Sequence, residues 1–111
     1  MRVVRATPRD YASHMAVLRR NYPVSNAVAH ALSLPEARKA CDEELQGGLP
    51  QDQETSGQHF HVLHQGDRKV GHLWLMEGPS KTLFLADIHI LSQFRSRGFG
   101  AKAIAWTDRR A

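Results

Sequence analysis

The chain has 111 residues, of which 41% are hydrophobic and 23% charged, so its size excludes more than one globular domain of ordinary composition. Its formal charge of +4 at pH 7 suits an anionic partner, such as a phosphorylated cofactor, nucleic acid or a membrane surface, without choosing among them. A lone cysteine, Cys41, excludes an internal disulfide, and no apolar run approaches the length of a membrane span or a signal peptide. These features together predict a cytoplasmic protein.

The first half of the chain predicts one strand followed by two helices. A short strand is expected over residues 2–6. A helix should begin directly after it, because Thr7 can cap the helix, proline suits its first position and Asp10 can bond back to the cap. The Asn-Tyr-Pro sequence at residues 21–23 should end this helix. The Ser-Leu-Pro-Glu sequence at residues 33–36 is a second start signal and predicts a helix to about Gln46.

The second half predicts a polar loop, three antiparallel strands and a final helix. The loop covers residues 51–58, the strands cover residues 59–65, 70–76 and 82–91, and the helix runs from about residue 98 onward. The predicted fold is therefore an α/β sandwich of the α+β kind, in which a mixed, largely antiparallel sheet is flanked by helices. A helix that leaves a central strand normally returns to a parallel neighbour, and none follows. Residues 1–111 are accordingly expected to form one incomplete domain.

The run Arg95-Ser96-Arg97-Gly98-Phe99-Gly100 lies between the last strand and the last helix. A glycine-rich turn at this place brings several backbone N–H groups around one point. The N-terminus of the helix adds a partial positive charge, and the two arginines add full ones. The run therefore predicts a phosphate-binding site.

This loop and the order of elements around it resemble the GNAT superfamily of acyl-CoA-dependent N-acyltransferases. The family signature places Arg or Gln three residues before a glycine, with a second Gly or Ala two residues later, and Arg95, Gly98 and Gly100 fit it. The segment Asp87-Ile88-His89-Ile90 stands where the fourth strand of the family ends, and residues 70–75 look like its preceding strand. The resemblance covers the family fold up to its third helix and implies a GNAT-like domain truncated there.

The resemblance implies that the chain binds acetyl-CoA (coenzyme A). The backbone amides of the loop would hold the pyrophosphate of the cofactor, and the end of the fourth strand would pair with its pantetheine arm. A backbone N–H at that strand end would also polarise the thioester carbonyl. The cofactor-binding residues implied are Ile90, Leu91, Arg95, Ser96, Arg97, Gly98, Phe99 and Gly100.

The chemistry implied is that of an acetyl-CoA-dependent N-acetyltransferase, in which a primary amine of a small molecule or protein attacks the thioester directly. The amine must first lose a proton to a base. The candidates are Asp87 and His89, which point to the same side of a strand because they are two residues apart. His89 stands where one subgroup of the family often carries Glu, and an imidazole titrates near neutral pH. A purely structural role in the strand stays open for each of these two residues.

The family fold continues beyond its third helix with a fifth strand, a fourth helix that often carries a tyrosine as general acid, and a final hairpin. Neither Tyr11 nor Tyr22 can be assigned that acid role. The alternative function is therefore that of a catalytically incomplete GNAT-like fragment, acting as a CoA-binding or interaction module. A homodimer is one way in which such a chain could be completed.

Two other readings of the sequence are less favoured. His59 and His61 share one face of a strand, but two histidines without a further ligand make a weak metal site, so no metal is expected. Residues 97–100 also match the start of an RNA-recognition segment. That segment would continue as a strand, whereas residues 101–105 are mostly helix formers, so no nucleic-acid partner is expected. No membrane partner is expected either, because no apolar run approaches the length of a membrane span.

Overall fold

The computed structural model describes residues 1–30 and 33–110, and of residues 23–30 the backbone alone. Its strands are β1 (Arg2–Arg5), β2 (Gln58–Gln65), β3 (Arg68–Glu77) and β4 (Leu83–Ile90), and its helices are α1 (Pro8–His30), α2 (Leu34–Gly48) and α3 (Phe99–Asp108). The strands form one sheet in the order β1-β2-β3-β4, and every described pair is antiparallel. The predicted fold class, an α/β sandwich with a mixed, largely antiparallel sheet flanked by helices, is therefore confirmed, although no parallel pair occurs among the described strands.

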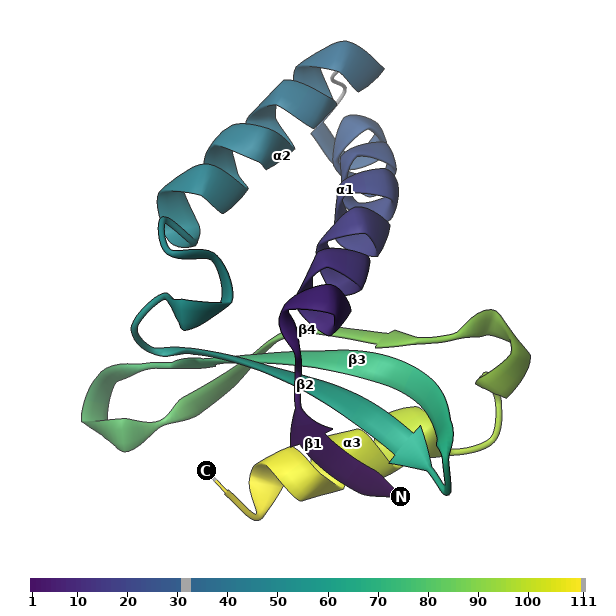
Figure 1. Cartoon of the computed structure of the whole chain (residues 1–111). Coiled ribbons are helices and arrows are strands. Elements are labelled where there is room, and N and C mark those ends of the chain that lie inside the picture. Colours follow the sequence, from purple (N-terminus) through teal and green to yellow (C-terminus); the bar gives the residue numbers. More distant parts are fainter. Residues whose placement is uncertain (31–32, 111) are drawn as a thin grey trace.

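The helices divide between the two faces of the sheet. Figure 1 shows α1 and α2 on one face and α3 on the opposite face. Each face has its own hydrophobic core. Below α1 and α2 the buried residues are Ala6, Met15, Leu18, Cys41, Leu45, Leu49, Phe60 and Val62. Below α3 they are Leu63, Val70, Leu73, Leu75, Phe94, Phe99 and Ala103.

Both helix starts on the α1–α2 face are formed by the residues that predicted them. The Thr7 hydroxyl accepts the backbone N–H of Asp10 at 3.1 Å, and the Asp10 carboxylate accepts the backbone N–H of Thr7 at 2.9 Å. At α2 the Ser33 hydroxyl accepts the backbone N–H of Glu36 at 3.3 Å. Each pair satisfies donors that the first turn of a helix leaves free.

The predicted end of the first helix is wrong. The break was expected at residues 21–23, but α1 continues through Pro23 to His30. A proline inside a helix removes the backbone hydrogen bond to the carbonyl four residues earlier, here that of Arg19, and crowds that carbonyl, yet its fixed φ is itself helical. A proline therefore costs a helix one bond without forbidding the turns that follow it.

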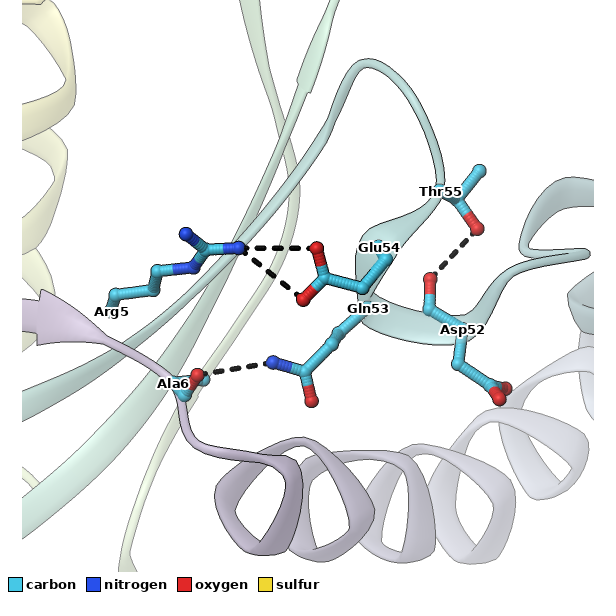
Figure 2. A network of polar contacts seen from close by, with 6 residues as sticks. All are labelled: Arg5, Ala6, Asp52, Gln53, Glu54 and Thr55. Carbon is cyan, nitrogen blue, oxygen red and sulfur yellow. Dashed lines mark hydrogen bonds and ion pairs between the residues drawn. The ribbon is translucent and has the colours of Figure 1, made fainter.

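The segment between α2 and β2 is fastened to the end of β1. It is not purely a loop, since residues Asp52–Glu54 form a short 3-10 turn. Figure 2 shows its contacts: an Arg5 guanidinium nitrogen lies 3.3 Å from the Glu54 carboxylate, and the Gln53 side-chain amide donates to the carbonyl of Ala6 at 3.2 Å. The ion pair is exposed and contributes little stability, so these contacts mainly fix the path of the chain.

The pairing of β3 with β4 contains a β-bulge. His72 lies opposite His89 and Trp74 opposite Asp87, but Leu75 lies opposite Leu85, so one residue of β4 has no partner. Opposite residues of an antiparallel pair point to the same face of the sheet. The Asp87 carboxylate and the His89 imidazole therefore lie on one side of it. Gly71 permits this close pairing, because a Cβ at this position would collide with the carbonyl oxygen of His89.

Candidate active site

A buried hydrogen-bond partner of Asp87 comes from the other end of the chain. Nε2 of His14, on α1, lies 2.6 Å from Oδ2 of Asp87, on β4. The His14 side chain is only 1% exposed, whereas that of Asp87 is 34% exposed. An imidazole nitrogen and a carboxylate oxygen approach this closely only with a proton between them, since two lone pairs would repel. The contact therefore confirms that Asp87 faces α1.

Three imidazole rings follow one another from α1 to β4. The ring of His14 stacks on that of His72 at 4.9 Å between centroids, and His72 stacks on His89 at 6.1 Å. The middle ring is buried, and its Nδ1 has no hydrogen-bond partner among the described residues. The prediction that Asp87 and His89 share a side of the strand is met, with two further histidines beside them.

The surroundings of His72 and His89 lower the pKa of both rings and favour their neutral form. Burial, followed by the positive charge of Lys69, lowers the pKa of His72 from 6.5 to about 3. Burial also lowers the pKa of His89, the nearby Arg95 lowers it further, and Asp87 opposes them. A neutral imidazole can accept a proton, so His89 keeps the capacity to act as a base. In the part of the chain that the structure describes, no three His, Cys, Asp or Glu side chains are arranged to hold a metal ion.

The sequence contains a signal for the role of His14. The apolar stripe of the first helix runs through Tyr11, Met15 and Leu18, and His14 falls on the same side at helical spacing. A histidine on an apolar stripe needs a polar partner across the interface. For His72 the sequence signal is weaker, because the alternation of residues along a strand does not say which face of the sheet His72 points to.

A cavity of about 420 Å³ lies between α1, α2 and the sheet. Its lining is mostly apolar and includes Leu18, Leu45, Leu49, Trp74, Met76 and Leu85. Two carboxylates, Glu44 and Asp87, belong to its wall. The exposed part of the His14–Asp87 pair is thus reachable by a ligand in this cavity.

The predicted phosphate loop follows β4 directly. A 3-10 turn over Ser92–Phe94 leads into it, and Gly98 has a φ of 82°, in the left-handed region that glycine tolerates best. No side chain caps the N-terminus of α3, and a Cβ on Gly98 or Gly100 would meet no protein atom within 4 Å. Among the described residues, nothing therefore caps the start of α3 or fills the space beside its two glycines, a setting that fits an anionic group.

The arginines of the loop have different contacts. Nε of Arg95 donates to the carbonyl of Ile90 at 3.0 Å, which ties the loop to the end of β4. The Arg97 guanidinium lies 5.8 Å from the centre of the Phe94 ring. Arg95 thus positions the loop as well as adding charge to it.

The backbone at the end of β4 has one side in use and one side open. The Leu91 N–H already donates to the carbonyl of Val70 on β3 at 2.9 Å. Because backbone groups alternate along a strand, those of Ile90 point the other way, where Arg95 reaches its carbonyl. Among the described strands β4 has no neighbour on that side. Of the predicted pantetheine contacts, Ile90 is thus the one whose N–H faces the open edge.

The chain matches no protein-family model and no curated protein sequence. Its fold is similar to that of the crystal structure described as the "putative acetyltransferase (YycN)" of Bacillus subtilis. The TM-score is 0.84 at 23% sequence identity, over 97% of this chain and 71% of that one. The fold of this chain is thus GNAT-like, as the resemblance predicted.

Within residues 1–30 and 33–110, no helix has the length and apolar character needed to cross a membrane.

Proposed function

We propose that this protein transfers an acetyl group from acetyl-CoA to a primary amine. The observation that carries the proposal is the arrangement along β4. Asp87 belongs to the wall of the cavity. Ile90 lies three residues later, about 10 Å along the strand, and leads into the predicted phosphate loop at the start of α3, called the cradle below (residues 95–100). One strand thereby connects a base in an amine-sized cavity to a loop suited to phosphate.

The residues around the cradle fit the two ends of acetyl-CoA, which supplies an activated acetyl thioester. The N–H groups from Gly98 to Ala101 would hold the pyrophosphate, with Arg97 beside them. The Ile90 N–H, on the open edge of β4, would polarise the thioester carbonyl. Leu91 would contact the pantetheine arm through its side chain, since its N–H is bonded to β3.

The cavity indicates an acceptor amine attached to an apolar group. Its lining offers apolar side chains on both helices and on the sheet, and a carboxylate at Asp87 that can pair with an ammonium group. Asp87 would take a proton from the ammonium and leave a neutral nucleophile. His89, with its lowered pKa, is the alternative base on the same face.

The test is calorimetric titration of CoA into the wild type and into Gly98→Glu. A carboxylate in the cradle would repel the pyrophosphate, so affinity should fall by more than tenfold. Gly66→Glu is the matched control, because Gly66 also has a positive φ, 61°, and open space around it, but lies in the turn between β2 and β3. It should bind CoA like the wild type.

Equal affinity in Gly98→Glu and the wild type would refute the cradle. A second assay follows thiol release from acetyl-CoA in the presence of a panel of primary amines. CoA binding without any amine-dependent thiol release would favour the other candidate, a CoA-binding module without turnover.

A further inference from the structure

We propose that His14 is a positioning residue for the acetyl transfer: it donates its Nε2–H to Oδ2 of Asp87 and leaves Oδ1 to take the proton of an amine bound in the cavity. This inference rests on the proposed function. It adds a polar residue from α1, 73 positions away in the sequence from Asp87, to proposed catalytic and cofactor-binding residues that otherwise lie on β4 and the segment after it.

The geometry of the pair favours this role over a purely structural one. The histidine is completely buried and the carboxylate is one-third exposed, so the pair has a fixed end and an accessible end. A ligand in the cavity meets the accessible end, because Asp87 belongs to the cavity wall. A buried histidine needs a polar partner, and here that partner is a carboxylate that a ligand can also reach.

The groups packed around His14 keep its ring in one orientation. His72 stacks on one side at 4.9 Å, and Phe60 meets the ring edge-on at 6.1 Å. Of the charged groups nearby, Lys69 on β3 and Asp10 on α1 form an ion pair at 3.3 Å, while Arg20 on α1 and Arg95 add positive charge on the side of His89. On β4, His89 and Asp87 complete the surroundings. The pair is therefore held by neutral rings, and Asp87 is the anionic group that His14 touches.

Asp87 carries a proton from the amine to the departing thiolate. The ammonium N–H bond breaks and an O–H bond forms at Oδ1 of Asp87, while His14 keeps its proton and its bond to Oδ2. The neutral amine then forms the new C–N bond as the thioester C–S bond breaks. The carboxyl returns its proton to the departing thiolate, and the second amine proton passes to solvent. Asp87 is thereby regenerated, and His14 fixes its orientation throughout.

Two measurements test the proposal. The first is the nitrogen NMR pattern of the histidine rings in the intact protein at neutral pH. His14 should show the Nε2–H tautomer in the wild type and lose this single pattern in Asp87→Ala, which removes the acceptor. An Nδ1–H tautomer in the wild type would overturn the proposal without any need of a folded His14 variant.

The second measurement is kinetic. His14→Phe should lower kcat by about tenfold with the KM for acetyl-CoA unchanged, and His14→Gln, which keeps a donor, should restore part of the rate. In the background of Asp87→Ala, His14→Phe should cost nothing more, because His14 acts through Asp87. His61→Phe is the matched control, since this ring packs against Trp106, on α3.

The outcomes separate the inference from the proposed function. A His14→Phe protein that folds and turns over like the wild type overturns the inference alone. A wild type that binds CoA but releases no thiol with any amine overturns the proposed function, and the inference with it. A rate loss in His14→Phe that persists in the Asp87→Ala background overturns the positioning role through Asp87.

Discussion

His72 should make the protein sensitive to mild acid. Its ring is 2% exposed, and burial lowers its pKa from 6.5 to about 3, with Lys69, His14 and His89 acting in the same direction. In the unfolded chain the ring takes up a proton near pH 6.5, but in the folded protein it stays neutral until about pH 3. Between these values the unfolded state binds more protons, so stability falls as the pH is lowered.

The size of the effect follows from the two pKa values. Each pKa unit corresponds to about 1.4 kcal/mol, and integration from pH 7 to pH 5 gives a loss of about 2 kcal/mol from His72 alone. The lowered pKa values of His61 and His89 act with the same sign and add to it. Asp10 affects stability in a different pH range. Burial would raise its pKa, but hydrogen bonds from Thr7 and Lys69 lower it below 3.8, so its contribution to the free energy of unfolding is lost only at lower pH.

The assay is urea unfolding, followed by circular dichroism at pH 7 and pH 5. The wild type should lose about 2 kcal/mol or more, and His72→Leu should lose about 2 kcal/mol less than the wild type. At pH 7 the variant should be at least as stable, because it removes a buried nitrogen that has no partner among the described residues.

Leu73→Ala is the control for a general loss of stability. Leu73 is completely buried in the core below α3 and does not titrate. This variant should be less stable by about 3 kcal/mol at both pH values and keep the pH dependence of the wild type. If His72→Leu shows the same difference between pH 7 and pH 5 as the wild type, then His72 is not the buried neutral imidazole described above.

Three further predictions concern the fold. Gly71→Ala should lower the free energy of unfolding by about 2 kcal/mol in chemical denaturation, because its Cβ would force β3 away from β4. The control Gly47→Ala, with open space around the new Cβ, should be neutral or stabilising in the same assay. Thr7→Ala should cost about 1 kcal/mol in the same assay, because the α1 cap with Asp10 is lost. Cys41 should react slowly with a thiol reagent at pH 8 in the native protein and rapidly in urea, since burial and the neighbouring carboxylates raise its pKa.

Local features of the fold could be predicted from the sequence. The helix starts at Thr7 and Ser33 depend on residues three positions apart, and such contacts form within one turn of the chain. The three hairpin strands follow from alternating apolar residues between turn sequences. The turn between β4 and α3 could be located because Gly98 tolerates a backbone conformation that other residues adopt poorly.

Contacts between distant segments could not be predicted in the same way. The pairing of His14 with Asp87 joins the first helix to the last strand, and nothing in either segment specifies the other. The length of α1 was also missed, because the proline at position 23 is a local signal that the rest of the helix overrides. Both cases are decided by how elements pack, which local patterns do not report.

The β-bulge in β4 explains how one strand serves both a core and a site. If the pairing of Leu75 with Leu85 continued without a bulge, Ala86 would lie opposite Trp74 and Ile88 opposite His72. Asp87 and His89 would then point into the apolar core below α3. The extra residue shifts the register by one, so that the two polar side chains face α1 and Ile88 packs against that core instead. The bulge is therefore the feature that places the polar residues of a hydrophobic strand in the wall of the candidate site.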